Sequence, residues 1–482
     1  MEIQQQAGKN FLWLTVAQAA VRILGVGFYL FLARVLSDAG IGQYNFISGF
    51  VPFWFIVIDF GGANFLYREW SKKRPEVQDA QTDFNILFTT RFIITAVVFC
   101  LFVGVNIFIN HEILWPLILF YFSMFLATFL NLYDLYLQSG NQFRFTAIRQ
   151  IIEKTVTVVL GFALLWYHAA LWLVFVAIVA SQFVSAFYYY RKVISLKVRF
   201  SLNWPRMKEL FTKGMPFMFI AIFASVYARI DTVMLRYMKD FATVGWYGAA
   251  YKFLDISALF SVLFTTSVFP LFASLSGDPN RRQELDEFFY QGLRIIFSVG
   301  IFIALCLVLL APWLIKWFFP ESFSPAILAL RILMLGQVLI FLSIYFSNLL
   351  IIQNQERKSL VIVIISAALN IGLNFYLIPK FSLYGAAWAT VVAECGNLLM
   401  LQYFVSWKKH YGVLARMAFL VILNSVCFWG LKVLGQLNSP VYVTSLITLN
   451  AVILFALKLL TTKDIKLFLN PLLNKFAPAN NL

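Results

Sequence analysis

Apolar stretches of about 20 residues recur along this chain from one end to the other, and each is long enough to cross a lipid bilayer as a helix. Hydrophobic residues make up 61% of the 482 residues, and charged residues make up only 12%. A water-soluble chain of this length would instead divide into domains with polar faces. The sequence therefore predicts an all-α, polytopic membrane protein.

The apolar runs between polar breaks predict about 14 transmembrane helices. The expected spans are residues 11–33, 41–63, 84–108, 114–136, 147–167, 171–190, 214–237, 246–271, 288–313, 326–352, 360–378, 383–405, 414–434 and 441–460. None of the connections between these spans is long enough to fold as a domain. Any function must therefore be performed within the membrane.

Basic residues are concentrated in alternate connections between the spans. The chain has 38 Lys and Arg residues against 22 Asp and Glu residues, a net charge of +16, and its longest connection, residues 191–213, is basic. Loops on the cytoplasmic side of a membrane retain positive charge, so the N- and C-termini are both expected to be cytoplasmic. Nucleic acid is not an expected partner, because the sequence contains no soluble basic domain.

Cysteine and histidine form no recognisable site in the sequence. The four cysteines fall inside apolar runs without a CxxC spacing, and the three histidines are scattered at or beside loops. This pattern predicts no metal site, no disulfide framework and no cofactor. A Ser/His/Asp order and a phosphate-cradling glycine loop are also missing, so an enzyme is not expected. Segment 464–476 places apolar residues near one helical face among lysines and is expected to be an interfacial helix.

An internal repeat relates the two halves of the chain. The connection after the first span, Leu32–Phe46, resembles the connection after the seventh, Met234–Phe253. The matched pairs are Arg34 with Arg236, Gly42 with Gly245, and Tyr44 with Tyr247. A repeat that recurs six spans later keeps the same orientation, which predicts two pseudo-symmetric six-helix lobes with the substrate site between them.

The repeat divides the chain into four expected parts. Residues 1–190 form the N-terminal lobe, residues 191–213 the basic cytoplasmic connection, and residues 214–405 the C-terminal lobe. Residues 406–482 hold the last two spans and the interfacial tail. The last two spans are then not part of either six-helix lobe.

Four short motifs carry a resemblance to a known family. They are GMP at Gly214–Pro216, RIDTVML at Arg229–Leu235, VGWYGAAYK at Val244–Lys252 and LYGAAWATVVAE at Leu383–Glu394. With the span count, their order and spacing resemble the polysaccharide transporter branch (Wzx-type O-antigen and lipid-linked oligosaccharide flippases) of the multidrug/oligosaccharidyl-lipid/polysaccharide exporter superfamily. The resemblance covers essentially the whole chain.

The resemblance implies a fold, a substrate class and partners. The two lobes would enclose a V-shaped central lumen, and the protein would move an undecaprenyl-diphosphate-linked oligosaccharide from the cytoplasmic to the periplasmic leaflet of a bacterial inner membrane by alternating access. The glycan, an O-antigen, capsule or exopolysaccharide repeat unit, is left open. The implied partners are this lipid-linked oligosaccharide, membrane lipids, a polysaccharide polymerase and the chain-length machinery, with a monomeric transport unit.

Three cations inside the spans are the expected contacts of the lipid diphosphate: Arg22, Arg229 and Lys252. Charges in apolar spans are costly and mark functional positions. Arginine in particular stays ionised and offers planar donors to phosphate oxygens. The resemblance also implies a basic lumen lining. For Lys252 a plainer alternative stays open, since it lies three residues from Asp255 on one helical face and the two charges would neutralise each other.

Three acidic residues are candidates for ion coupling or charge balance: Asp231, Asp255 and Glu394. They are the carboxylates furthest from the span ends, and intramembrane carboxylates often serve ion or proton movement. Arg229 and Asp231 are two residues apart, so they point in nearly opposite directions on a helix and cannot form a simple pair. We expect Arg229, Asp231, Lys252 and Asp255 to share one cavity, because all four lie at matching depths. Pairing of Glu394 with a neighbouring arginine is the open alternative.

Further charges near the span ends are expected to form gates. The candidates are Asp59, Arg91, Asp134, Lys154 and Arg294 near the cytoplasmic surface, and Arg331 near the outer surface. The alternative is that these side chains only extend to the interface. Pro52 and Pro216 interrupt spans two and seven, where a bend would help the lobes rock.

Other functions stay open at this stage. A lipid II flippase and a multidrug or ion antiporter of the same superfamily would share the fold. A membrane glycosyltransferase or polymerase that uses a lipid-linked donor is less favoured. Such enzymes usually carry a large outer loop or an acidic pair in the first outer loop, whereas here that loop has only Asp38.

Overall fold

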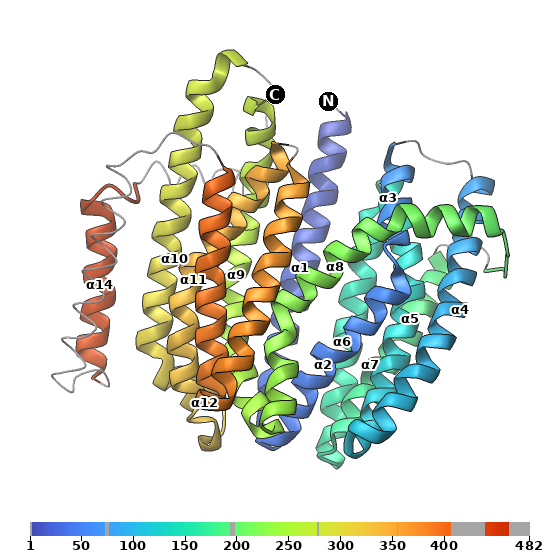
Figure 1. Cartoon of the computed structure of the whole chain (residues 1–482), viewed down its shortest axis with the longest axis horizontal. Helices are drawn as coiled ribbons and strands as arrows, with labels where there is room; N and C mark the ends of the chain where they lie inside the picture. The colour runs from blue at the N-terminus through green and yellow to red at the C-terminus, as the bar shows by residue number, and fades with distance from the viewer. Residues whose placement is uncertain are drawn as a thin grey trace. The chain divides into compact units, whose positions relative to one another are not determined.

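The computed structural model describes residues 2–72, 77–192, 198–276, 279–353, 355–405 and 439–461. Within these residues the chain is all-helical, with no β-strand (Figure 1). Contacts divide it into two compact units, Met1–Gly245 and Trp246–Leu482. We describe each unit by itself.

The first unit is a bundle of long helices with two shorter elements. Its elements are α1 (Glu2–Val35), α2 (Asp38–Asp59), α3 (Gly62–Lys72), α4 (Val77–Ile109), η1 (His111–Ile113), α5 (Leu114–Ser139), α6 (Phe143–Tyr167), α7 (Leu171–Lys192), α8 (Trp204–Met238) and the first turn of α9 (Phe241–Ser276). Helix α6 packs against both α1 and α7, and α7 also packs against α5. Helix α8 passes across α4 and α3 and then runs along α2 (Figure 1).

Side-chain caps begin the two helices that follow the repeated connections. Ser37 Oγ accepts the backbone N–H of Gly40 at 3.2 Å before α2, and Asp240 Oδ1 accepts the backbone N–H of Thr243 at 2.7 Å before α9. Both bonds satisfy backbone donors that a helix N-terminus leaves unpaired. The two connections of the sequence repeat therefore share a local structure.

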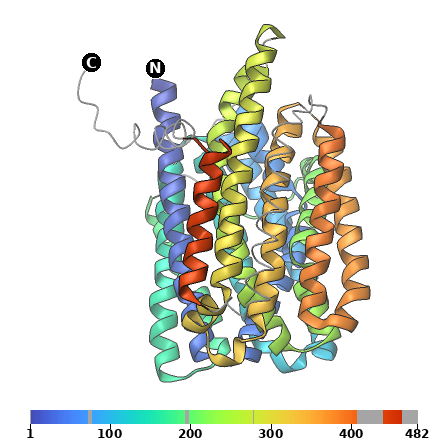
Figure 2. The same cartoon turned by 90° about the vertical axis from the view of Figure 1, so that its left-hand side faces the viewer.

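The second unit packs its long helices around an apolar core. Its elements are the remainder of α9, η2 (Pro279–Arg281), α10 (Arg282–Phe318), η3 (Glu321–Phe323), α11 (Ala326–Ile352), α12 (Glu356–Phe404) and α14 (Pro440–Ala456). Helix α11 packs against α10 and α12, and α10 against α14. Figure 2 shows that α10 extends beyond the ends of α11 and α12. Inside the core the Tyr345 hydroxyl donates to the Phe289 carbonyl oxygen at 2.9 Å.

Helix α12 consists of two helical segments joined at a kink. Ser382, with φ 53° and ψ −135°, has non-helical backbone angles, and Pro379 lies just before it. The kink falls between the expected spans 360–378 and 383–405, so it separates the two spans at the predicted place.

The all-helical membrane fold is confirmed. Ten described helices are long and apolar enough to cross a membrane, and the 48-residue stretch of α12 holds two of the expected spans. Helix α6 also corresponds to an expected span, and α14 to most of another. The expected span 414–434 and the tail 464–476 lie outside the described residues, so the number 14 is not confirmed.

Pro52 and Pro216 are the two prolines expected to bend spans two and seven. Pro52 and Pro216 lie inside α2 and α8, and both helices continue past them.

The contacts group α8 with the first unit, whereas the sequence repeat assigns it to the second lobe. The lobes at residues 1–190 and 214–405 stay a prediction.

Candidate functional site

Arg22 and Lys154 lie on two helices of the first unit that pack side by side. Arg22 is exposed on α1, and Lys154 is half-buried on α6. A Cβ atom added to Gly25, one turn after Arg22, would lie 3.1 Å from Lys154 Cε and 3.4 Å from its Nζ. The sequence predicts Arg22 in a substrate site and Lys154 at a gate, whereas the structure brings Lys154 to the Arg22 region of α1.

A buried polar network joins α5, α6 and α7. The guanidinium of Arg149 donates to the two carboxylate oxygens of Asp134 at 3.2 and 2.8 Å and to Glu153 Oε2 at 2.5 Å. Gln182 Nε2 donates to Glu153 Oε1 at 3.1 Å, and the Tyr189 hydroxyl donates to Asp134. Asp134, a predicted gate residue, is therefore held by Arg149.

Sequence reasoning missed the role of Arg149. No role is assigned to this residue from the sequence, where it lies at the start of the expected span 147–167. The signal was present in the sequence, since Glu153 lies four residues later, at the spacing of an ion pair on one helical face. The remaining partner, Asp134, is on another helix and leaves no such signal.

A second ion pair joins α2 and α4. Arg91 donates to Asp59, and its Nη1 also donates to the carbonyl oxygen of Thr128 on α5 at 2.9 Å. Only 1% of the Arg91 side chain is exposed. The two predicted gate residues thus contact each other, and their action as a gate stays a prediction.

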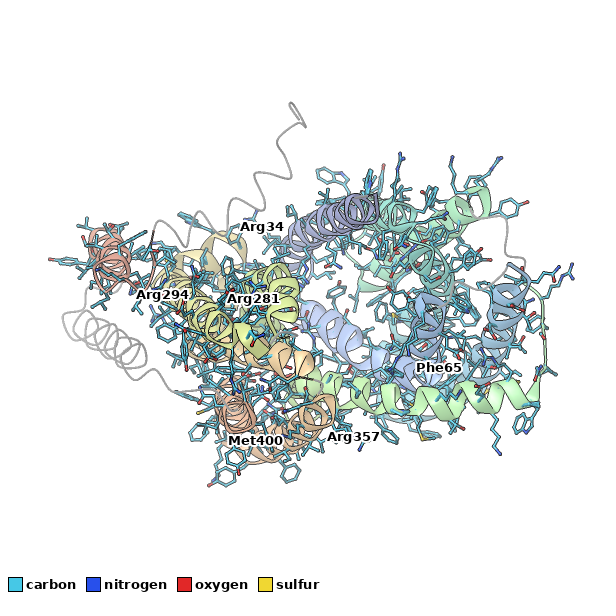
Figure 3. All side chains as sticks on the ribbon, turned by 90° about the horizontal axis from the view of Figure 1, so that it is seen from above. Arg34, Phe65, Arg281, Arg294, Arg357 and Met400 are labelled. Atoms are coloured by element: carbon cyan, nitrogen blue, oxygen red, sulfur yellow. The ribbon has the colours of Figure 1, made fainter. Side chains whose placement is uncertain are left out.

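Arg206, at the start of α8, ties that helix to α3 and α4. It donates to both carboxylate oxygens of Asp83 at 2.9 and 3.0 Å, to Glu69 at 3.0 Å and to Glu209 at 2.8 Å. Nearby, the Lys213 ammonium lies 5.4 Å from the centre of the Phe65 ring, which Figure 3 labels beside α8. Sequence reasoning did not identify these contacts. They hold the charged N-terminal part of α8, the helix that carries Arg229, against α3 and α4.

On α8 the two predicted charges differ in burial. Arg229 is exposed, whereas Asp231 is only 3% exposed and accepts the backbone N–H of Thr232 at 2.8 Å. This difference agrees with the opposite directions expected from their spacing. Lys252 and Asp255 on α9 are both half-buried and belong to the second unit. A cavity shared by all four residues stays a prediction.

The two glycines matched by the sequence repeat lie in direct backbone contact. A Cβ atom on Gly42 would lie 1.6 Å from the carbonyl oxygen of Phe241, and one on Gly245 would lie 2.3 Å from the carbonyl oxygen of Asp38. Neither position has room for a side chain, because the obstructing atoms are backbone. The beginnings of α2 and α9 therefore pack against each other through their glycines.

In the second unit, Glu394 lies among amide and hydroxyl side chains of α12. Glu394 is 8% exposed, and Asn397 Nδ2 donates to its Oε2 at 3.4 Å. Ser366 Oγ donates to Asn397 Oδ1 at 3.2 Å, and Asn374 Nδ2 donates to Asn370 Oδ1 at 2.9 Å. Asn370 and Asn374 lie four residues apart inside an apolar run, so the sequence carried a signal for this polar group.

The remaining gate candidates lie on α10 and α11. Arg294 is half-buried on α10 and is labelled in Figure 3. Arg331 is half-buried on α11, where its Nε donates to the carbonyl oxygen of Val308 at 3.2 Å. Across the residues that the structure describes, His, Cys, Asp and Glu form no group of three that could hold a metal ion.

Two curated relatives share about a quarter of the aligned residues. The "Capsular polysaccharide biosynthesis protein CapF" of Staphylococcus aureus is 24% identical over 45% of this chain and 54% of its own length. The "Probable low-salt glycan biosynthesis flippase Agl15" of Haloferax volcanii is 24% identical over 50% of this chain and 53% of its own length. The chain thus spans about half the length of the curated relatives it matches.

Solved transporter structures share the fold. The lipid II flippase MurJ in an inward closed conformation superposes with a TM-score of 0.73 and 14% identity, over 96% of this chain and 100% of MurJ. An inward-facing MATE-family multidrug resistance transporter of the MOP superfamily gives 0.63 and 15%, over 85% of this chain and 98% of that one. These neighbours and the relative from Haloferax volcanii are named as transporters or flippases, not as enzymes.

Two family profiles match the sequence. The MatE profile matches residues 216–376. The profile described as "Polysaccharide biosynthesis protein" matches residues 7–276, which is more than half of the chain. The predicted resemblance is therefore confirmed, and the chain belongs to this polysaccharide biosynthesis protein family, with the fold of MOP-superfamily transporters.

Proposed function

We propose that this protein is a flippase. It moves an undecaprenyl-diphosphate-linked oligosaccharide from the cytoplasmic to the periplasmic leaflet of a bacterial inner membrane by alternating access. The observation that carries the proposal is the exposure of two arginines, Arg22 and Arg229, inside apolar helices of a polysaccharide biosynthesis family member. A guanidinium exposed in a span is accessible to an anionic ligand, and the oxygens of a lipid diphosphate accept its planar N–H donors.

The relatives support the substrate class. One is named for capsular polysaccharide biosynthesis and the other for a glycan biosynthesis flippase. We extend this substrate class to the present chain. Its N- and C-termini are proposed to be cytoplasmic, and a polysaccharide polymerase and the chain-length machinery are proposed as further partners.

Ion coupling is part of the proposal. Among the three candidate carboxylates, Asp231 and Glu394 are buried, and Asp255 is half-buried. Glu394 is the preferred coupling group, because it is only 8% exposed inside an expected span, where carboxylates often serve ion or proton movement. Lys252 is proposed as a third contact of the headgroup.

A lipid II flippase is the second candidate, favoured by the superposition on MurJ over nearly the whole chain. Its substrate has the same lipid diphosphate and a different glycan. A gene deletion separates the two functions. The proposed function predicts loss of surface polysaccharide and accumulation of lipid-linked oligosaccharide on the cytoplasmic leaflet, with normal growth of the cell wall. Lysis of the deletion strain with normal surface polysaccharide would favour the lipid II function instead.

Complementation of that deletion tests the two arginines. Arg22→Ala and Arg229→Ala are expected to abolish surface polysaccharide at normal membrane abundance, and the Lys variants to retain part of it. Lys208→Ala is the matched control, because it removes an exposed cation near the start of α8, before the expected apolar span. Normal export by both alanine variants would contradict the proposed headgroup contacts.

A further inference from the structure

Residues 198–203, which precede α8, run along α4 without helical structure, and we call them the strap. The backbone N–H of Arg199 donates to Asn85 Oδ1 at 3.0 Å, and that of Ser201 donates to Thr89 Oγ1 at 2.9 Å. Two residues of extended chain span about 6.6 Å, and four residues of a helix rise about 6.0 Å. The spacing of the two donors therefore matches that of the two acceptors, and the strap is held in one register on α4.

The strap lies where α4 changes from charged to apolar. On one side of the two hydrogen bonds, Asp83 of α4 pairs with Arg206 at the start of α8. On the other side, α4 exposes apolar side chains, among them Phe92, Val97 and Leu101. Charged groups belong in the headgroup layer of a bilayer, and exposed apolar side chains belong in its hydrocarbon layer. The strap therefore lies at the boundary between these two layers.

The strap and the first residue of α8 expose large apolar side chains. Leu202 is 76% exposed and Trp204 is 75% exposed. Phe200 is also exposed, although its ring packs edge-on against Phe88 and Phe92 with ring centres 5.7 and 5.3 Å apart. A connection that lies in water would not present such side chains together, and tryptophan is enriched at membrane interfaces. These side chains suit contact with lipid.

The backbone of the strap also presents hydrogen-bond donors on its open edge. N–H groups of successive residues in an extended chain point to opposite edges, so those of Phe200 and Leu202 point away from Asn85 and Thr89. In the part of the chain that the structure describes, neither of these N–H groups has a hydrogen-bond partner. Unpaired donors are costly beside a hydrocarbon layer. A phosphate oxygen is a strong acceptor for them, and the exposed Arg199 adds a positive charge.

We propose that the strap binds the headgroup of an anionic phospholipid. The phosphate oxygens accept hydrogen bonds from the backbone N–H groups of Phe200 and Leu202. The Arg199 guanidinium supplies the preference for a negatively charged headgroup, and the exposed apolar side chains of the strap lie beside the acyl chains. Asn85 and Thr89 are positioning residues, because they hold the strap on α4. The site contains none of the residues proposed for transport, so it goes beyond the proposed function.

Trp204 allows the lipid beside the strap to be measured. Purified full-length protein is placed in phosphatidylcholine nanodiscs that contain a fraction of brominated phosphatidylglycerol or of brominated phosphatidylcholine. Bromine quenches tryptophan fluorescence on contact, and the difference between the wild type and Trp204→Phe isolates the signal of Trp204 among the 13 tryptophans. The measured quantity is the ratio of the association constants of the two lipids at this position.

The ratio is expected to favour phosphatidylglycerol and to depend on Arg199. A cation near a membrane surface changes the association of an anionic lipid by about fivefold, so Arg199→Gln should lower the ratio by about that factor. Arg199→Lys should retain most of it. Arg144→Gln is the matched control, because it removes an exposed cation from α6, a helix of the same unit, and it should leave the ratio unchanged.

Two neighbouring threonines on α4 give a second matched pair. Thr89 and Thr90 are both buried, and each donates to the carbonyl oxygen four residues earlier. Only Thr89 accepts a backbone N–H of the strap. Thr89→Val should therefore release the strap and lower the ratio several-fold, whereas Thr90→Val should not change it. Thermal unfolding of each variant confirms that it is folded.

Three results would overturn the proposal. The first is an unchanged ratio in Arg199→Gln, and the second is an equal effect of Thr89→Val and Thr90→Val. The third is loss of the preference for phosphatidylglycerol when inorganic phosphate is added, because the site would then take a free anion and not a lipid. Surface polysaccharide in the deletion strain is a separate measurement, so failure of the proposed function does not alter the ratio.

Discussion

Replacement of Arg149 by methionine provides a quantitative test of the buried network in the first unit. The substitution removes the guanidinium that donates to Asp134 and Glu153 and keeps a side chain that can pack. The two carboxylates then differ, because the Asp134 side chain is 6% exposed and that of Glu153 is 29% exposed. Glu153 is therefore less buried than Asp134, and Gln182 still donates to it.

The expected loss of stability comes mainly from Asp134. Breaking a buried ion pair by removing one partner costs about 3 to 5 kcal/mol, since the other charge is left buried without compensation. The Tyr189 hydroxyl still donates to Asp134, so we expect a value near the lower end, about 3 kcal/mol. Titration with SDS in mixed micelles, followed by tryptophan fluorescence and circular dichroism, measures this loss as a change in the free energy of unfolding.

Two further variants make the test decisive. Arg144→Met removes an exposed arginine from the same helix, where the lost cation–π contact with Trp13 is worth about 1 kcal/mol or less. The double variant Asp134→Leu with Arg149→Met removes both partners and should recover most of the stability, because no unpaired charge stays buried at that position. The reasoning is refuted if Arg149→Met is no more destabilised than Arg144→Met, or if the double variant is less stable than Arg149→Met.

Three other predictions concern separate parts of the molecule. Gly42→Ala should destabilise the protein by at least about 3 kcal/mol in the same SDS titration, because backbone atoms obstruct the new methyl group, whereas Gly104→Ala, with nothing within 4 Å, should be neutral. Arg206→Ala should speed amide hydrogen exchange in the first turns of α8, since that residue joins α8 to α3 and α4, and exchange as slow as in the wild type would contradict this. Glu394→Gln should keep substrate binding and lose the stimulation of flipping by a proton or sodium gradient in proteoliposomes. Unchanged stimulation would exclude Glu394 as the coupling group.

The positions of the helices were largely predictable because apolar runs determine them. The expected span 326–352 has the same bounds as α11, and the break between spans 360–378 and 383–405 contains Ser382. The errors occur where a helix is amphipathic. Helix α8 begins at Trp204 and not at 214, and the expected span 41–63 ends earlier, at Asp59, where Phe60 and Gly61 adopt positive φ before the separate helix α3.

The charged residues of the candidate site could be located from the sequence, but their partners could not. A charge inside an apolar span can be recognised in a single sequence. Its partner lies on another helix, and hydrophobic periodicity does not encode how the residues of the two helices are aligned. Arg149 shows this, because only one of its two carboxylate partners, Glu153, lies on the same helix, four residues away. Lys154 shows it more clearly, since its place against α1 depends on a single missing side chain at Gly25.

Exposure separates the charges that are paired inside the helix bundle from those proposed to contact a substrate. Arg91 is almost fully buried against Asp59, and Arg149 against Asp134, so each guanidinium is paired with a carboxylate of the protein itself. Such residues hold helices together, and their loss affects folding before function. Arg22 and Arg229 also lie in apolar helices but remain exposed. Substitution of an exposed side chain removes little buried packing, so alanine there should leave folding nearly unchanged and affect transport, the opposite of the result expected for Arg91 and Arg149.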